Sequence, residues 1–298
     1  MHVVLAGASG LIGSALDRAL EARGDRVTRL VRRRPSSPRE VQWNPGGSRL
    51  NPMHLEGADA VISIGGASIS KLPWTKKYRK KILESRIGTT RTIATAIHEM
   101  GADGPALLSG SAVGYYGSAP GREMDERSAS GDTFLARVCV DWEEEARRVE
   151  DTTRVALLRT AMVLHPDGVL GPLNLLTKLG ISGPIGSGNQ IWPWICLEDE
   201  VGAILHVLDN EISGPVNLVA PEPASNREIG KELARQLRRP YAIPVPGVLL
   251  RGVVGKDAAE SLLLADAKVK PAVLHSTGFE FCYPDVRGAL KAALAPAE

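Results

Sequence analysis

A glycine-rich turn near the start of the chain, residues 7–13 (GASGLIG), constrains the fold more than any other feature. An apolar run with β-branched residues, 3–5, precedes the turn. A helical pattern with one apolar and one charged face follows it. A strand, a glycine turn and a helix in this order form the context in which such glycines bind a dinucleotide. Gly7 permits the tight turn, Gly10 lets the backbone approach a pyrophosphate, and Gly13 lets the helix pack closely on the strand.

The phosphates of this dinucleotide are expected at the helix N-terminus, where unpaired backbone N–H groups and the helix dipole favour an anion. Without the flanking strand and helix, three spaced glycines would be as consistent with a turn that needs left-handed backbone. The flanks therefore favour dinucleotide binding. The residues of this turn predicted to bind the cofactor are Gly7, Ser9, Gly10, Leu11, Ile12 and Gly13.

Three arginines follow the second predicted strand, residues 27–31. An NAD site usually has Asp or Glu at this position, about 20 residues beyond the turn, to bind the ribose 2′-OH. A carboxylate would repel a 2′-phosphate, whereas an arginine can bind one through two parallel hydrogen bonds. The sequence thus predicts NADP(H), with Arg32 as the leading contact and Arg33 as the second. The alternative is a solvated basic loop.

Composition narrows the class of protein. The chain has 298 residues, 43% of them hydrophobic and 23% charged, as in an ordinary globular protein. The net charge of +2, with no aromatic residues interleaved among the basic ones, gives no support to nucleic-acid binding. Three separated cysteines and six histidines without HxH or HExxH spacing predict neither a disulfide framework nor a metal site. No signal-like segment or apolar run of about 18 residues is present, so we expect a cytoplasmic protein that does not bind membranes.

Strands and helices alternate through the first half of the chain, which predicts an α/β fold of the Rossmann type, a doubly wound parallel sheet. Further strands are expected at 41–43, 59–64, 106–108, 155–158 and 216–219, with helices from about Thr75 and Phe134. Residues that follow two of these strands, Gly65, Gly66, Ala67 and Ser109, are predicted to bind the cofactor.

The domain prediction has two parts. Residues 1–164 form the dinucleotide-binding domain, with 195–220 packing back onto it. Residues 165–298 form a smaller lobe that faces the substrate. The glycine- and proline-rich segment 168–193 is expected to be a long functional loop. Oligomeric state is left open, with a homodimer as one alternative.

Several segments resemble the short-chain dehydrogenase/reductase superfamily in its extended, epimerase-like form. They are more similar still to an atypical branch, the SDR39U family. The segments that carry this resemblance are 7–13, 111–117, 134–136 with 142–143, 159–164, 183–190 with 194–195, and 278–279. The resemblance covers nearly the whole chain and implies an NADP-binding Rossmann domain with a C-terminal lobe over the nicotinamide. It implies little about the substrate.

The resemblance also implies a serine after the fifth strand and a Tyr-x-x-x-Lys pair on the next helix. In this chemistry the tyrosine carries the proton and the lysine lowers its pKa, which is near 10 without help. Ser111 fills the serine position, with Ser109 as its neighbour. The tyrosine and lysine positions hold Leu135 and Cys139 instead.

Other groups are weighed as replacements. Tyr115 and Tyr116 follow the serine and are the predicted proton carriers, with loop packing as the alternative. Cys139 on an apolar stripe is expected to be a small buried hydrophobe. Cys196 stands where related sequences often carry histidine, so another proton carrier is missing. Glu143 is interpreted as a surface residue without a role.

Three polar or aromatic features point to a substrate. A dense basic run, residues 71–81, is either a solvated helix face or an electrostatic funnel for an anionic ligand. Trp192 and Trp194 are interpreted either as a wall for a substrate or as anchors of the lobe. Arg159 and Gln190 are candidate substrate contacts.

We interpret the chain as an NADP(H)-binding, atypical short-chain reductase that transfers a hydride on a small carbonyl or hydroxyl substrate. Ser111 would orient or polarise the reacting oxygen, and Tyr115 or Tyr116 would transfer the proton. The alternative is a catalytically silent NADPH-binding sensor or scaffold, because Leu135 and Cys139 replace the acid–base pair. A sugar-nucleotide epimerase ranks lower, since no group for its proton transfer is found.

Overall fold

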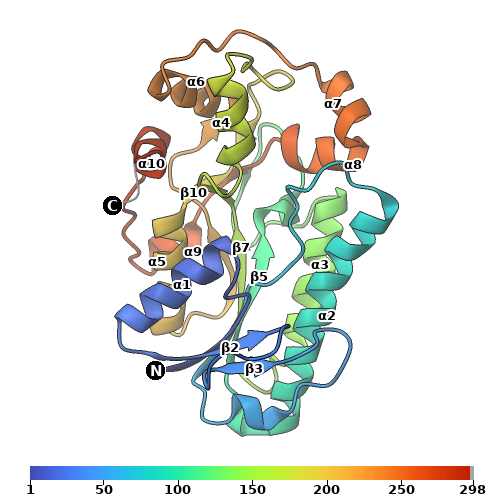
Figure 1. The fold of residues 1–298 in the computed structure, drawn as a ribbon, viewed down its shortest axis with the longest axis vertical. Helices are drawn as coiled ribbons and strands as arrows, with labels where there is room; N and C mark the ends of the chain where they lie inside the picture. Colours follow the sequence, from blue (N-terminus) through green and yellow to red (C-terminus); the bar gives the residue numbers. More distant parts are fainter. Residues whose placement is uncertain (296–298) are drawn as a thin grey trace.

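The computed structural model describes residues 1–295 and is built around a parallel sheet of seven strands in the order β11-β7-β5-β4-β1-β2-β3 (Figure 1). This confirms the predicted Rossmann-type fold. The strands of the sheet are β1 (His2–Ala6), β2 (Arg26–Val31), β3 (Glu40–Gln42), β4 (Ala60–Ser63), β5 (Ala106–Ala112), β7 (Val155–Thr160) and β11 (Gly214–Leu218).

Helices cover both faces of the sheet (Figure 1). On one face lie α1 (Leu11–Ala22) and α5 (Leu197–Asp209), and on the other lie α2 (Lys76–Met100) and α3 (Phe134–Arg147). The sequence of β1 shows why both faces are covered. Its alternate residues enter different cores, Val3 and Leu5 beside α1 and α5, Val4 and Ala6 beside α2 and α3. A strand buried on both sides is therefore a continuous apolar run.

Side-chain caps fix the starts of the long helices where the sequence predicts them. The Thr75 hydroxyl accepts a hydrogen bond from the Tyr78 backbone N–H, and α2 begins at the next residue after Thr75. Thr133 caps α3 in the same way through the N–H of Ala136. Such caps satisfy backbone donors that have no partner inside the helix.

Of the remaining elements, α4, α6 and α7 lie in the C-terminal lobe at the top of the view in Figure 1, whereas α9 packs beside α5 in the core of the sheet. The lobe's main core joins α4, α6 and α10 with the short strands β8, β9, β10 and β12. The bounds of these and the remaining elements are η1 (Pro52–Leu55), η2 (Gly101–Asp103), η3 (Val113–Tyr116), β6 (Glu123–Met124), β8 (Met162–Leu164), α4 (Leu170–Lys178), β9 (Ile191–Trp192), β10 (Trp194–Cys196), β12 (Ala224–Ser225), α6 (Asn226–Gln236), α7 (Gly247–Val254), α8 (Lys256–Ala258), η4 (Ala259–Leu263), β13 (Lys268–Val269), α9 (Ala272–Ser276) and α10 (Val286–Ala293).

The glycine- and proline-rich segment is more regular than the sequence predicts. Residues 170–178 form α4, because Leu170 is fully buried in the lobe core and Leu173 packs against it. The prediction of a continuous loop over 168–193 is therefore wrong for this part. Within residues 1–295, no helix combines the length and the apolar character needed to cross a membrane.

Strand order determines where a ligand can bind. The chain passes from β1 outward to β2 and β3, then returns to β4 on the other side of β1. In open α/β sheets, ligands bind in the crevice beyond the carboxyl ends of the strands at such a reversal. Ala6 and Ser63, the last residues of β1 and β4, are paired in the sheet and mark this crevice.

Candidate functional site

The glycine turn between β1 and α1 packs so tightly that two of its glycines are required by space alone. Gly7 has a φ of +105°, and a Cβ there would lie 2.8 Å from the backbone nitrogen of Gly65. A Cβ on Gly13 would collide with the carbonyl oxygen of Gly7. The turn is thus pressed between its own helix and the residues that follow β4.

The N-terminus of α1 is open. Gly10 is the N-cap, no side chain within residues 1–295 caps the helix, and the first turn holds no acidic residue. The Gly10 N–H donates to the Gly7 carbonyl at 3.0 Å, which closes the turn beneath the helix. A Cβ on Gly10 would have only one close neighbour, the Gly7 carbonyl oxygen at 3.4 Å. Open N–H groups, bare backbone and the positive end of the helix dipole together fit a pyrophosphate.

The arginines after β2 differ in what they contact. The Arg33 guanidinium forms two hydrogen bonds with the Glu40 carboxylate, at 2.6 and 2.8 Å, and this contact lowers the pKa of Glu40 to about 2. Arg32 is exposed, and no hydrogen bond or ion pair from its guanidinium is found among the described residues. Because Arg33 already has an anionic partner, Arg32 is the better candidate for binding a phosphate.

The segments after β4 and within β5 lie in different surroundings. Gly65 contacts the glycine turn directly, and the Ala67 N–H donates to the Ser85 hydroxyl at 2.9 Å. Ser109 lies inside β5, which extends to residue 112, beyond the predicted end at 108. The side chain of Ser109 is fully buried and donates to the Gly110 carbonyl, an arrangement that argues against direct contact with a cofactor.

A buried ion pair lies behind the predicted catalytic serine. The Arg159 guanidinium binds both carboxylate oxygens of Glu143 at 2.8 Å, and the Ser111 hydroxyl donates to the same carboxylate at 2.6 Å. All three side chains are at most 4% exposed. Ser111 and Arg159 are paired in register on neighbouring strands, which brings their side chains to the same glutamate.

Tyr115 and Tyr116, which follow Ser111 in the chain, contact this network in different ways. The Tyr116 hydroxyl accepts from Arg159 at 2.8 Å and donates to the Asn217 side-chain oxygen at 2.7 Å. Burial raises the pKa of Tyr116 to about 12, so its proton is held firmly. Tyr115 is only partly buried, and the Arg159 guanidinium lies 3.6 Å from the centre of its ring.

These contacts correct two sequence interpretations, those of Glu143 and Arg159, and bear on two others. Glu143 is not a surface residue, because it is the buried acceptor of the network. Arg159 is ion-paired inside the protein and is not placed to meet a substrate. The Ser111 hydroxyl donates to Glu143, a contact that competes with donation to a substrate oxygen, and the catalytic role of Ser111 stays a prediction. The Tyr116 hydroxyl is held by Arg159 and Asn217 and its pKa is raised, which favours Tyr115 over Tyr116 as the predicted proton carrier.

The positions where tyrosine and lysine were expected are also buried. Leu135 belongs to an apolar cluster with residues of α7, α8 and η4, so the lobe packs over it. Cys139 is buried, and desolvation raises the pKa of its thiol to about 12. The expectation of a small buried hydrophobe at Cys139 agrees with this placement. Cys196 is likewise buried, where it caps α5 and donates to Asp199.

The remaining substrate candidates in the lobe have structural partners. Trp192 and Trp194 are buried, and their indole N–H groups donate to the carbonyls of Leu263 and Glu222. Gln190 is buried and donates to the carbonyls of Ile185 and Leu263. These contacts favour the interpretation of the tryptophans as anchors of the lobe and argue against a substrate role for Gln190.

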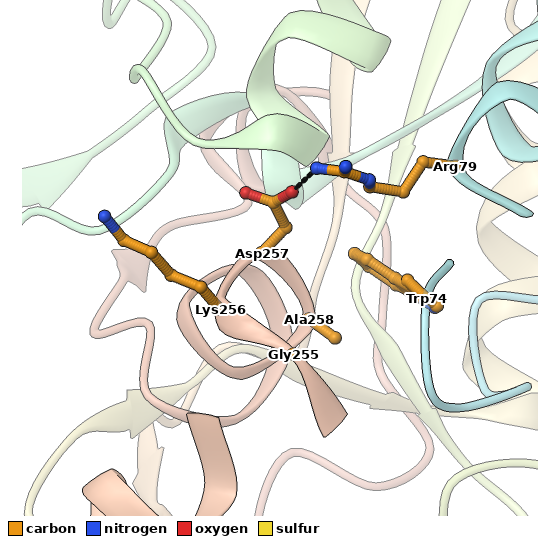
Figure 2. A pocket seen from close by; sticks show the side chains of 6 residues that line it. All are labelled: Trp74, Arg79, Gly255, Lys256, Asp257 and Ala258. Carbon is orange, nitrogen blue, oxygen red and sulfur yellow. Dashed lines mark hydrogen bonds and ion pairs between the residues drawn. The ribbon is translucent and has the colours of Figure 1, made fainter. Parts of the chain in front are cut away.

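A pocket of about 280 Å³ lies between the start of α2 and the short helix α8 (Figure 2). Trp74 and Arg79 line it from one side, Lys256 and Asp257 from the other, and Arg79 forms an ion pair with Asp257. Of the basic residues in the run 71–81, Arg79 lines the pocket, and the lysines at 76, 77, 80 and 81 are exposed on the first turns of α2. The charged side chains that line the pocket are therefore Arg79, Lys256 and Asp257, at the place where α2 meets the lobe.

Glu200 is a buried carboxyl group near the carboxyl edge of the sheet. It accepts a hydrogen bond from the Thr160 hydroxyl at 2.8 Å, and its second oxygen has no partner among the described residues. Desolvation raises the pKa of Glu200 to about 8. This shift favours the protonated form of Glu200 in the folded protein at neutral pH.

Replacement of Glu200 by glutamine is expected to stabilise the protein at pH 8 and to leave it nearly unchanged at pH 5. Between the ordinary glutamate pKa and about 8, the folded state holds a proton that the unfolded state has lost, so stability falls as pH rises. The slope is at most about 1.4 kcal/mol per pH unit. Urea unfolding at pH 5, 6, 7 and 8 should show a shallower slope in Glu200→Gln than in the wild type. Parallel slopes would contradict this assignment.

Within residues 1–295, no group of three or more His, Cys, Asp or Glu side chains is arranged to hold a metal ion. A model of the NAD dependent epimerase/dehydratase family matches residues 3–219, and a domain of unknown function (DUF1731) matches residues 245–293. An epimerase family protein of Mycobacterium bovis is 38% identical over 97% of this chain and 96% of its own. The human epimerase family protein SDR39U1 is 35% identical over 99% of this chain and 100% of its own.

Comparison of structures gives the same relationship. The crystal structure of human SDR39U1 (isoform 2) with NADPH superposes with a TM-score of 0.89, at 34% sequence identity, over 98% of this chain and 99% of that one. MoeE5 in complex with UDP-glucuronic acid and NAD superposes with a TM-score of 0.76 at 20% identity, over 98% of this chain and 97% of that one. At that identity the second likeness concerns the fold alone.

Proposed function

This chain belongs to the NAD dependent epimerase/dehydratase family, and on that premise we propose that it binds NADP(H) and transfers a hydride to or from a small carbonyl or hydroxyl substrate. The observation that carries the proposal is the open N-terminus of α1 above the bare backbone of Gly10. The relative crystallised with NADPH supports the choice of cofactor.

The residues that would hold the cofactor follow from the geometry. The N–H groups of Leu11 and Ile12 at the start of α1 would bind the pyrophosphate, and Arg32 would bind the 2′-phosphate. When bound, the nicotinamide supplies or accepts the hydride. Tyr115 is the proposed proton carrier, because the hydroxyls of Ser111 and Tyr116 are hydrogen-bonded within the Glu143–Arg159 network.

The proposed substrate is a small molecule with an anionic group. The exposed lysines at 76, 77, 80 and 81 on the first turns of α2 support this, since clustered cations raise the local concentration of anions. The proposed location is the cytoplasm.

Replacement of Arg32 by glutamine is expected to weaken NADPH binding about 10- to 100-fold and to leave NADH binding unchanged. A charge-assisted hydrogen bond to a phosphate contributes about 1.5–3 kcal/mol, and about 1.4 kcal/mol corresponds to a factor of ten. Calorimetric titration of the purified protein with each nucleotide measures both affinities. Arg26→Gln, at the opposite end of the same strand, is the matched control. A wild type that prefers NADH, or equal losses for both nucleotides, would refute the role of Arg32.

A second candidate function is a catalytically silent NADPH-binding sensor or scaffold. The observation that favours it is the burial of Leu135 and Cys139 at the expected acid–base positions. Incubation with NADPH and a panel of aldehydes and ketones, followed as loss of nicotinamide absorbance, separates the two functions. Turnover that depends on Tyr115 supports the reductase. No turnover, together with a protein captured only in the presence of NADPH, supports the silent module.

A further inference from the structure

Arg86 is a cation on the inward side of α2 that the site described so far does not use. Its Nη1 donates to the carbonyls of Ala67 and Ile82, at 3.1 and 3.0 Å. Its guanidinium carbon lies 5.2 Å from the centre of the Trp142 ring. The guanidinium also packs against Gly66, where a Cβ would lie only 3.0 Å from it. Arg86 is thus held rigidly beside the segment that follows β4.

Arg86 has no negative partner in the described part of the chain. No ion pair to a carboxylate involves it, and hydrogen bonds are found from Nη1 but not from Nε or Nη2. Desolvation lowers its pKa from the ordinary arginine value, which shows that its surroundings disfavour the charge. A poorly solvated cation is costly unless an anion or several acceptors face it. The unused donors therefore point to an acceptor that is not part of the protein.

The order of the strands places this cation along the path of the dinucleotide. Arg32 follows β2, and the open helix N-terminus follows the next strand, β1. A dinucleotide with its 2′-phosphate at Arg32 and its pyrophosphate at the turn continues toward β4 and β5. Gly65 touches the glycine turn, and Gly66 with Arg86 comes directly after it. In this binding mode the nicotinamide half of the molecule would lie nearest to Arg86.

We propose that Arg86 binds the nicotinamide half of NADP(H), donating from Nε or Nη2 to the phosphate and hydroxyl oxygens of the nicotinamide ribose. The inference rests on the proposed binding of NADP(H). It also gives a physical reason for Gly66, since any side chain there would displace the guanidinium. Cys139 of α3, at the position where a lysine was expected, is uncharged and buried. In the proposed arrangement, Arg86 of α2 supplies the positive charge of the cofactor site instead.

A comparison of two ligands distinguishes a contact of Arg86 with the nicotinamide half of the cofactor from a contact with the adenosine half. NADPH carries both halves, whereas adenosine 2′,5′-bisphosphate lacks the nicotinamide ribose and its phosphate. Arg86→Gln is expected to weaken NADPH binding at least tenfold, about 1.4 kcal/mol, and to change binding of the bisphosphate less than twofold. Arg86→Lys keeps the charge and should lie between the wild type and Arg86→Gln. Arg26→Gln again serves as the surface control.

Calorimetry is the appropriate readout, because Trp142 lies against Arg86 and its fluorescence would respond to the substitution itself. Circular dichroism and thermal melting show whether each variant is folded before titration. Equal weakening of both ligands would assign Arg86 to holding residues 65–67 in place and overturn the proposal. Unchanged NADPH binding in a folded Arg86→Gln would overturn it as well. A wild type that binds no NADPH would refute the proposed function, a result distinct from either of these.

Discussion

Replacement of Glu143 by glutamine should lower the free energy of unfolding by about 3–5 kcal/mol, the cost of removing one partner from a buried ion pair. Arg159 would keep its charge at 2% exposure without a carboxylate to balance it. Ser111 would lose an ionised acceptor at the same time. Urea unfolding at pH 7, with the midpoint and slope compared with those of the wild type, measures the loss.

Two further variants allow the loss of stability in Glu143→Gln to be interpreted. Glu150→Gln removes one partner of an exposed ion pair on the surface, and should cost less than about 1 kcal/mol. The double replacement Glu143→Leu with Arg159→Leu removes both charges and should recover much of the stability, because no unpaired charge stays buried. A loss below about 1 kcal/mol in Glu143→Gln would show that water or another group compensates Arg159.

The glycine turn could be predicted from the sequence, whereas the Glu143–Arg159 network could not, because the two differ in how far apart their residues lie along the chain. The glycine turn is a local feature, and its strand, turn and helix all lie within residues 2–22. The Glu143 contact depends on three segments, β5, α3 and β7, whose register appears only in the fold. One feature of the sequence does indicate this network. Arg159 interrupts an apolar strand, and a charge in a buried strand requires a partner.

Arg86 carries a similar signal. It lies on the stripe of α2 that contains Ile82, Thr89 and Ile93, all of them buried. A helical pattern that places an arginine on its buried stripe predicts either a carboxylate partner or a ligand. The short strands of the lobe gave no such signal, because β9 and β10 pair only with segments distant in sequence. Their formation depends on tertiary contacts and not on local propensity.

Gly10 and Gly13 are expected to respond differently to alanine, although both belong to the predicted motif. A methyl group on Gly13 collides with the Gly7 carbonyl, so Gly13→Ala should destabilise the fold and lose NADPH binding together. A methyl group on Gly10 meets only that carbonyl oxygen, at 3.4 Å, so Gly10→Ala should fold.

The methyl group of Gly10→Ala would nevertheless stand where the pyrophosphate approaches the open helix N-terminus, and the backbone contact would be lost. We expect NADPH binding to weaken about 10- to 100-fold, corresponding to about 1.4–3 kcal/mol, with a melting temperature close to that of the wild type. Gly252→Ala is the matched control, because its Cβ meets no neighbour within 4 Å and Gly252 lies outside the glycine turn. Thermal melting and calorimetric titration of the three variants distinguish a loss of stability from a loss of NADPH binding. If Gly10→Ala binds NADPH as the wild type does, the phosphates do not lie on this turn, and the glycines serve only the packing of β1 against α1.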